Sequence, residues 1–320
     1  MNNALASVSL DLDNRWSYMK THGDPGWQSF PSYLDLVVPR FLKFLTQRKM
    51  RITVFVVGQD AALECNAASL RAIADAGHEI GNHSFRHEPW LHLYGAEEVE
   101  REIALAERHI FAVTGKKPIG FRGPGFSLSP NALEALARLG YRYDASTFPT
   151  FIGPLARAYY FMKSKLGAAD LQQRSALFGG VRQGFRPLKA YRWRIPAGDI
   201  VEIPVTTMPL LRLPIHTSYV LYLSTLSRRL ALAYFDLALA MCRMTGVQPS
   251  LLLHSLDFLG SDDGVGLEFF PGMSLPYRRK LDIVDSVLAS LRRHYRLVTM
   301  EQHARAVVGA APAKRLSYAS

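Results

Sequence analysis

The sequence has 320 residues, of which 48% are hydrophobic and 20% charged, and it contains only two cysteines. This composition is typical of a folded domain and excludes a disordered, collagen-like or disulfide-stapled chain. The net charge of +11 is concentrated, because residues 151–200 contain nine basic and only two acidic residues. Such a local excess indicates an anionic partner for this segment, such as a phosphate, a phospholipid headgroup or a nucleic acid.

Two stretches of the sequence bear on location. Residues 1–7 have neither a basic start nor an apolar run, so we predict no secretory signal peptide. The longest apolar stretch, residues 219–244, is interrupted by Arg228, Arg229 and Asp236, so we do not expect it to span a membrane. We therefore expect a cytoplasmic protein without a transmembrane segment.

Short apolar and β-branched runs alternate with helical patterns along most of the chain. We predict strands at 6–12, 52–58, 78–82, 120–122, 141–144, 200–206, 251–255 and 296–299. We predict helices at 31–48, 67–76, 96–114, 130–139 and 275–295. This alternation is typical of βα units and a parallel sheet or barrel. Residues 150–198 and 207–248 break it, so we predict a single domain, residues 1–320, in which the range 150–248 is a large basic, aromatic and amphipathic insertion.

The clearest chemical signals are acidic residues and histidines at predicted strand ends. Asp11 and Asp13 end the first strand two positions apart, and two carboxylates at an apolar strand end need a compensating cation. His83 and His87 follow the third strand with a spacing that would place both rings on one face of a helical turn. This spacing suits two imidazoles on one metal ion. Two histidines at this spacing are by themselves more often ordinary polar surface residues. The acidic residues Asp11 and Asp13 upstream favour the metal interpretation.

Two more strand ends carry polar residues. Arg122 ends the fourth predicted strand, and the rigid Gly-Pro-Gly turn around Pro124 can aim its guanidinium at a carboxylate. His254 ends a strand that is otherwise apolar, so it would have to share one end of the sheet with the other groups. Each residue alone is better interpreted as a plain loop arginine or a satisfied core histidine.

Considered together, these motifs resemble the polysaccharide deacetylase family, the NodB-like carbohydrate esterases of family 4, in its Asp-x-Asp subgroup. The resemblance rests on five segments in the family's order, at residues 9–13, 83–87, 121–127, 143–149 and 251–254. It implies a distorted (β/α)7 barrel of the α/β class. It also implies a divalent metal held by Asp13, His83 and His87, most often zinc, with cobalt, nickel and manganese as alternatives.

The resemblance further implies a role for each remaining residue. An open position on zinc would acidify a water molecule and polarise an amide carbonyl. Asp11 would be the general base, oriented by Arg122, and His254 would protonate the departing amine. Asp144 would either orient Arg122 or cap its own turn. Asp257 is a candidate partner for His254, since the proline that often follows this histidine in relatives is absent here.

The expected reaction is hydrolysis of an N-acetyl or N-formyl amide on an amino sugar. The insertion interleaves basic, aromatic and aliphatic residues, which suits a lipid-phosphate site or a helix lying in a membrane surface. We therefore expect a polyprenyl-phosphate-linked sugar of cell-envelope biosynthesis, and peripheral binding at the cytoplasmic face of the inner membrane. The cations expected to take part are Arg182, Arg186, Lys189 and Arg192. The alternative is that residues 207–248 simply cover the barrel and the basic run is solvated.

Other functions stay open. The chain could be a soluble oligosaccharide or peptidoglycan-precursor deacetylase, or a degenerate barrel that only binds glycans. A metal-independent branch of the family acts on other amides, but the presence of all three expected ligands disfavours it. A nucleic-acid partner is disfavoured as well, because the sequence has no zinc finger, RNP-like or helix-turn-helix signature. The sequence indicates no oligomeric state.

Overall fold

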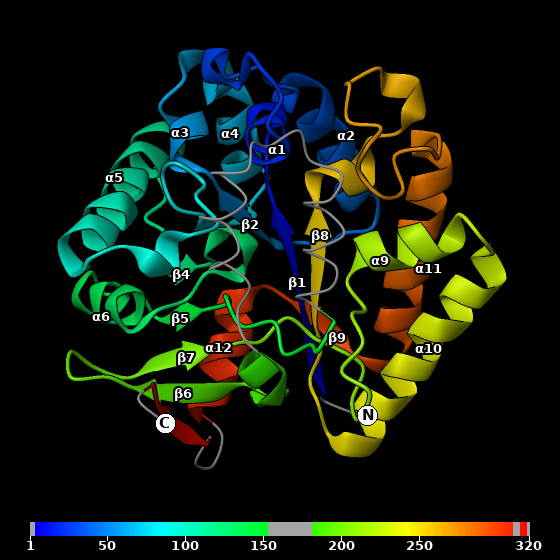
Figure 1. Cartoon of the computed structure of the whole chain (residues 1–320). Coiled ribbons are helices and arrows are strands. Elements are labelled where there is room, and N and C mark those ends of the chain that lie inside the picture. Colours follow the sequence, from blue (N-terminus) through cyan, green and yellow to red (C-terminus); the bar gives the residue numbers. More distant parts are fainter. Residues whose placement is uncertain (1–3, 153–180, 310–313, 319–320) are drawn as a thin grey trace.

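A ring of parallel strands forms the centre of the molecule (Figure 1). The computed structural model describes residues 4–152, 181–309 and 314–318. The ring contains β1 (Leu5–Asp11), β2 (Thr53–Val56), β3 (Glu79–Asn82), β4 (Gly120–Phe121), β5 (Tyr143–Asp144), β7 (Ile200–Glu202) and β8 (Ser250–His254). Their order is β7-β5-β4-β3-β2-β1-β8, and each neighbouring pair is parallel.

The two ends of this sheet are joined just beyond β7. The backbone N–H of Val205 donates to the carbonyl of Thr147 at 2.9 Å, which continues the pairing of β5 and β7. The next residue, Thr206, donates its N–H to the carbonyl of Ser250 at 3.1 Å, at the start of β8. These bonds close the ring, so the predicted α/β architecture and distorted seven-stranded barrel are confirmed.

Three short strands lie outside the ring. β6 (Tyr191–Arg194) is antiparallel to β7, β10 (Arg315–Ser317) is parallel to β6, and β9 (Arg296–Val298) is parallel to β1. β6 alternates buried aromatic residues with more exposed arginines, as a strand does, although we expected an insertion there. Within the range 150–248, the strand predicted at 200–206 is present as β7 and belongs to the barrel.

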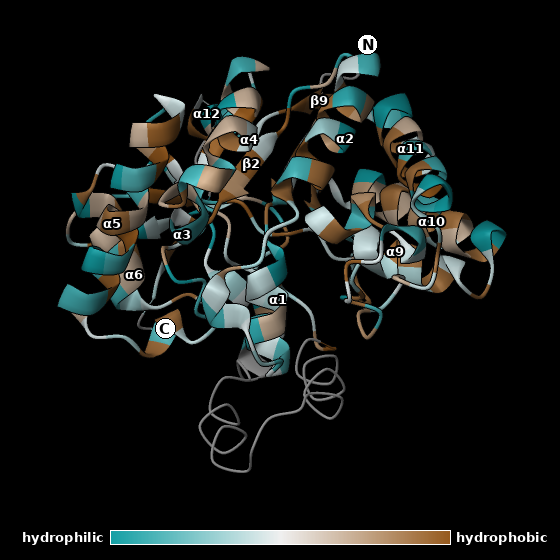
Figure 2. Ribbon diagram, turned by 90° about the horizontal axis from the view of Figure 1, so that it is seen from above, coloured by the Kyte–Doolittle hydropathy of each residue, from teal (hydrophilic) through white to brown (hydrophobic). Residues whose placement is uncertain are grey.

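Helices surround the barrel, and hydrophilic and hydrophobic residues alternate along them (Figure 2). They are α1 (Arg15–His22), α2 (Leu34–Gln47), α3 (Gly58–Ala61), α4 (Glu64–Asp75), α5 (Ala96–Thr114), α6 (Pro130–Arg138), α9 (Thr217–Ser224), α10 (Arg228–Thr245), α11 (Tyr277–His294) and α12 (Met300–Gly309). Single 3₁₀ turns lie at Trp27–Ser29, Leu91–Leu93, Pro124–Phe126, Val181–Phe185, Ser255–Phe258 and Ser261–Asp263. All five predicted helices are present, as α2, α4, α5, α6 and α11. Helix α6 begins as expected, because the Ser129 hydroxyl caps it and Pro130 is its first residue.

Residues 207–248 contain α9 and α10, which pack against each other and against α11. The inner face of α10 is buried through Phe235, Leu239 and Cys242 and joins the largest apolar core, between the strands and α2, α10 and α11. This part of the insertion therefore covers the barrel, which was the simpler of our two expectations. No helix in the described ranges is both long and apolar enough to cross a membrane.

Candidate metal centre and active site

The predicted site residues meet at the carboxyl ends of the barrel strands. Parallel strands bring these ends to one edge, which is where barrel enzymes carry their functional groups. Asp11 ends β1 and is paired in register with His254, which ends β8. Asp13, His83 and Arg122 each follow within two residues of a strand end. The sequence motifs are therefore adjacent in space.

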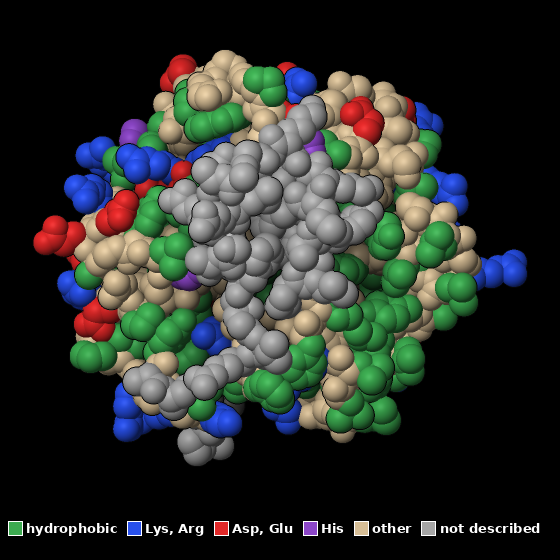
Figure 3. All heavy atoms as spheres, in the orientation of Figure 1, with side chains coloured by type: hydrophobic (Ala, Val, Ile, Leu, Met, Phe, Trp, Pro, Cys, Tyr) green, Lys and Arg blue, Asp and Glu red, His purple; other side chains and the backbone are tan. Residues whose placement is uncertain are grey.

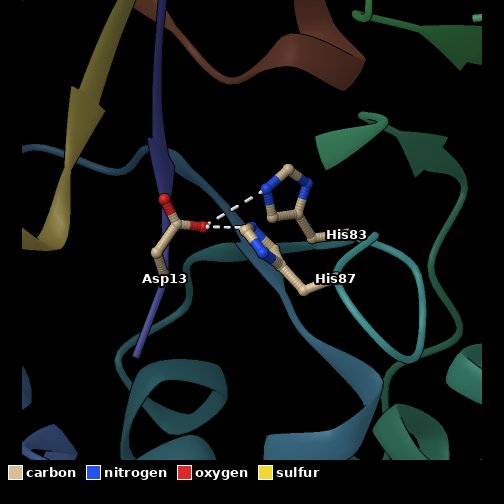
Figure 4. A group of neighbouring side chains, drawn as sticks. All are labelled: Asp13, His83 and His87. Carbon is tan, nitrogen blue, oxygen red and sulfur yellow. Dashed lines mark hydrogen bonds and ion pairs between the residues drawn. The ribbon is translucent and has the colours of Figure 1, made fainter. Parts of the chain in front are cut away.

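Asp13, His83 and His87 form a compact group (Figure 4). The Oδ1 atom of Asp13 lies 2.9 Å from Nε2 of His87 and 3.3 Å from Nε2 of His83. One donor atom from each residue lies within 4.8 Å of the other two. Two imidazoles and one carboxylate are a donor set that zinc binds, and three protein ligands leave room for a water molecule. These residues thus fit a divalent metal.

The segment that carries the two histidines is not helical, so the expected helical turn is wrong. Ser84 and His87 have left-handed backbone angles, with φ of 61° and 54°, and residues 83–88 form an irregular loop. The buried carboxylate of Glu102 holds the loop by accepting from the N–H groups of Phe85 at 3.1 Å and Arg86 at 2.5 Å. The bend, rather than helical spacing, brings both histidines to Asp13.

Contacts behind the group orient its members. Nδ1 of His83 lies 2.6 Å from the carbonyl oxygen of Arg122, so this nitrogen donates and Nε2 is left for a metal. The hydroxyl of Tyr18 donates to Oδ2 of Asp13 at 3.1 Å. Burial by itself would raise the pKa of Asp13, but His87 and His83 hold it well below the usual value. Asp13 is therefore a carboxylate facing the two rings.

Asp11 is held by a fully buried arginine. Nη1 of Arg122 donates to Oδ1 of Asp11 at 2.6 Å and to the Ser9 hydroxyl at 2.9 Å, and its Nε donates to the Ala145 carbonyl at 3.0 Å. The guanidinium also lies 4.4 Å from the ring centre of Phe55. The other oxygen of Asp11 is 4.0 Å from Nε2 of His83. One oxygen is thus fixed by Arg122, and the second borders the candidate metal site.

The turn after β5 is capped by Asp144. Its carboxylate accepts from the N–H of Ser146 at 3.0 Å and from the hydroxyl of Ser146 at 2.7 Å. The same hydroxyl accepts from the N–H of Gly123 at 2.8 Å, just before the buried Pro124. Burial raises the pKa of Asp144. These contacts support the capping alternative, in which Asp144 ties its own turn to the arginine loop.

His254 is linked to Asp257 through a serine that the motifs did not indicate. Nδ1 of His254 lies 3.0 Å from the hydroxyl of Ser218, which donates to Oδ1 of Asp257 at 2.8 Å. A serine hydroxyl has one hydrogen, so while it donates to Asp257 it accepts from Nδ1–H of His254. Nε2 is then the ring nitrogen that carries no hydrogen when His254 is neutral. Oδ2 of Asp257 also accepts the backbone N–H of His254 at 3.0 Å.

The buried His216 beside this relay was not predicted either. Its ring centre is 5.5 Å from that of His254, and its Nδ1 has no hydrogen-bond partner within the described parts of the chain. Burial, with help from His254 and Arg122, lowers the pKa of His216 well below its usual value. His216 is therefore neutral near pH 7. It and Ser218 lie at the start of α9, where the sequence shows only an apolar run.

The cations expected to bind an anion or a membrane do not share one contact network. The Arg186 guanidinium donates to the Thr147 hydroxyl at 3.3 Å and lies 5.3 Å from the ring centre of Trp193. Nη2 of Arg192 donates to the Val308 carbonyl at 3.1 Å. Lys189 is exposed. The Arg182 side chain and the four cations Arg157, Lys163, Lys165 and Arg174 lie outside what the structure describes.

Comparison with known proteins finds a family match for part of the chain. Residues 24–143 match the family model for polysaccharide deacetylases. The peptidoglycan deacetylase-like protein FGM2 of Gibberella zeae is 32% identical over 164 residues, which cover 49% of this chain and 46% of the relative. A peptidoglycan deacetylase of Helicobacter pylori is 31% identical over 112 residues, which cover 35% and 37%. The chain thus spans less than half the length of either relative.

Solved structures extend the likeness to the whole fold. A proposed polysaccharide deacetylase from Mycobacterium smegmatis has a TM-score of 0.62 and 18% identity, over 98% of this chain and 94% of that one. The allantoinase PuuE has a TM-score of 0.59 and 16% identity, over 97% and 92%. The sequence likeness to the polysaccharide deacetylase family therefore covers residues 24–143, and the solved structures share the fold of nearly the whole chain.

Proposed function

We propose that the chain is a metal-dependent hydrolase that removes an N-acyl group, acetyl or formyl, from an amino sugar. The observation that carries this proposal is the meeting of Asp13, His83 and His87 with the Asp11–Arg122 pair and His254 at one barrel end. The family model and the names of the curated relatives support the same reaction class.

A divalent ion held by Asp13, His83 and His87 would polarise an amide carbonyl and make a water molecule more acidic. Asp11 is placed to take the proton from that water, because its free oxygen borders the same three residues. Arg122 orients the carboxylate of Asp11 through the 2.6 Å contact. The Arg122 side chain is fully buried, so water does not compete for its contact with Asp11.

His254 completes the reaction by protonating the leaving nitrogen. An amide nitrogen leaves as a neutral amine only if it receives a proton as the carbon–nitrogen bond breaks. Ser218 and Asp257 hold Nδ1 of His254 on one side, which leaves Nε2 to deliver the proton. Ser218 and Asp257 are thus positioning residues, and His254 is the general acid.

A lipid-linked substrate is the finer part of the proposal, and it rests on an apolar stripe along the outer face of α10. Leu230, Leu237 and Met244 are 71%, 55% and 76% exposed, and Leu226 just before the helix is 81% exposed. A spacing of seven residues is close to two helical turns, so these side chains share one face. Figure 3 shows hydrophobic side chains gathered over α9 and α10. This is the pattern of a helix lying in a membrane surface.

Basic residues flank the stripe and would suit an anionic leaflet. Arg229 and Arg243 are exposed on α10, and neither has an acidic partner in the described ranges. The same insertion places Ser218 beside His254, so a membrane-bound stripe would bring the barrel mouth near lipid-linked sugars. We propose peripheral binding at the cytoplasmic face of the inner membrane, with a polyprenyl-phosphate sugar as substrate.

A soluble peptidoglycan-type substrate is the second candidate, favoured by the names of the curated relatives. Acetate or formate release from matched lipid-linked and free N-acylhexosamines, and from peptidoglycan fragments, tests both. We expect release from the lipid-linked sugar to be faster. Release from none of these substrates would contradict the proposed activity, and equal rates would contradict the lipid linkage.

Flotation with anionic vesicles tests the proposed surface directly. We expect the wild type to float with phosphatidylglycerol vesicles, and the double variant Leu230→Gln/Leu237→Gln to remain in the dense fraction. The matched control is Leu93→Gln, which removes another exposed leucine from outside the stripe. Absence of wild-type flotation, or flotation of the double variant at the wild-type level, would remove the membrane proposal. The expected contribution of the insertion cations is tested by neutralising Arg182, Arg186, Lys189 and Arg192 together.

A further inference from the structure

A cavity lies at the end of the barrel opposite the candidate active site. Its volume is about 1020 Å³. Its lining includes Arg51, which precedes β2, Glu79, which begins β3, Ile119, which precedes β4, and Arg142, which precedes β5. These are the amino ends of the strands, whereas the metal-binding group lies at their carboxyl ends. The cavity is therefore separate from the site described above.

The cavity wall is strongly basic. Six of its lining residues are cationic: Lys49, Arg51, Lys116, Lys117, Arg142 and Arg305. It contains only two acidic residues, Glu79 and Glu301. A smaller neighbouring recess shares Lys49 and Arg51 and adds Arg292 and Arg296. The local excess of positive charge thus continues beyond the first cavity.

The two acidic residues do not neutralise this wall. Glu79 turns into the barrel, where it accepts from the hydroxyls of Thr53 and Tyr143, both at 2.6 Å. Glu301 pairs with Arg142 at 3.1 Å and with Arg305 at 2.5 Å. Glu107, outside the lining, pairs with Lys117 at 3.4 Å.

Three cations are left for a ligand. Lys49, Arg51 and Lys116 are exposed and have no acidic partner among the residues that the structure describes. Lys49 is also held with a φ of 51°, a left-handed angle that is uncommon outside glycine. Lys49 and Arg51 line the same cavity, so both contribute positive charge to its wall.

A buried donor lies among these charges. His78 is only 5% exposed and lines the cavity. Its Nδ1 accepts the N–H of Ile52 at 3.2 Å, so the neutral ring carries its hydrogen on Nε2. No residue in the described ranges accepts from that Nε2. Apolar side chains of Ile80, Ile119 and Leu297 complete the lining.

We propose that this cavity binds a small soluble molecule that bears at least two phosphate groups. Unpaired cations that line one cavity can bind phosphate oxygens, and the guanidinium of Arg51 can bind two oxygens at once. The volume suits a small ligand, because pockets of about 300–1,000 Å³ commonly hold one. The Nε2–H of His78 supplies a neutral donor within the same recess. This proposal does not depend on the reaction at the other end of the barrel.

Isothermal titration calorimetry with inorganic pyrophosphate at low ionic strength tests the proposal. We expect saturable binding to the wild type, and affinity weakened about tenfold or more in Arg51→Gln/Lys116→Gln. The matched control is Arg101→Gln/Arg279→Gln, which removes two exposed cations elsewhere and should bind like the wild type.

Three outcomes would overturn the assignment. The first is no saturable binding to the wild type. The second is equal affinity in the wild type and Arg51→Gln/Lys116→Gln, which would place pyrophosphate elsewhere, such as on an active-site metal. The third is loss of phosphatidylglycerol vesicle binding in Arg51→Gln/Lys116→Gln while pyrophosphate binding is unchanged, which would identify a lipid headgroup as the source of the phosphate.

Discussion

Replacing Asp11 with asparagine is expected to lower kcat by about 10²–10⁴-fold while leaving about one metal ion per chain. The asparagine keeps the size of the side chain but cannot accept a proton from water. Loss of a positioned general base typically costs 10²–10⁴-fold in rate, so we expect about that reduction in kcat. The proposed metal ligands are Asp13, His83 and His87 and do not include Asp11, so the metal content should not change. Steady-state kinetics and elemental analysis of the same sample measure both quantities.

The matched control for this experiment is Asp35→Asn, which changes an exposed carboxylate in the first turn of α2. It should leave both kcat and metal content at the wild-type level. Wild-type kcat in Asp11→Asn would show that another group takes the proton. Loss of the metal in Asp11→Asn would instead make Asp11 a ligand, and the division of roles between Asp11 and Asp13 would be wrong.

The second large effect is on stability, and it follows from the burial of Arg122. Arg122→Leu leaves the Asp11 carboxylate inside the barrel without its partner. Breaking a buried ion pair by removing one partner typically costs about 3–5 kcal/mol in the free energy of unfolding. We expect a loss of this size in urea denaturation of the metal-free protein. Arg138→Leu, which removes an exposed arginine paired with Glu100, should cost less than about 1 kcal/mol.

A double variant separates the ion pair from simple packing. In the Asp11→Asn background, Arg122→Leu leaves no unpaired carboxylate in the barrel. The loss in the free energy of unfolding caused by Arg122→Leu should therefore be smaller by about 1 kcal/mol or more. An equal cost in both backgrounds would mean that Arg122 stabilises the barrel through its contacts with Ser9, Ala145 and Phe55 instead.

The strand ends were the most predictable part of the molecule. Buried strands such as β1 and β8 are runs of apolar residues, and a polar residue that ends such a run must have a partner there. Asp11 and His254 are paired across β1 and β8, as their positions in the sequence suggested. Helix α5 is also predicted to the residue, because acidic residues begin it and Gly115 ends it in a left-handed conformation.

The parts that could not be predicted depend on contacts between distant segments. The loop that carries His83 and His87 has left-handed residues that are held by Glu102, which lies on another element. Ser218 contributes to the site only because α9 packs against the end of β8, and a lone serine gives no signal of that. The strand β6 was missed because we assigned its alternating aromatic residues and arginines to the basic insertion as a whole.

The account depends on a single divalent ion held by Asp13, His83 and His87. Anomalous diffraction from crystals of the zinc-loaded protein, recorded on both sides of the zinc absorption edge, tests this most directly. We predict one strong peak bonded to Oδ1 of Asp13 and to Nε2 of both histidines, and no peak there in His83→Ala. A zinc peak at any other place in the wild type, or an active enzyme with no metal at these three residues, would contradict the account.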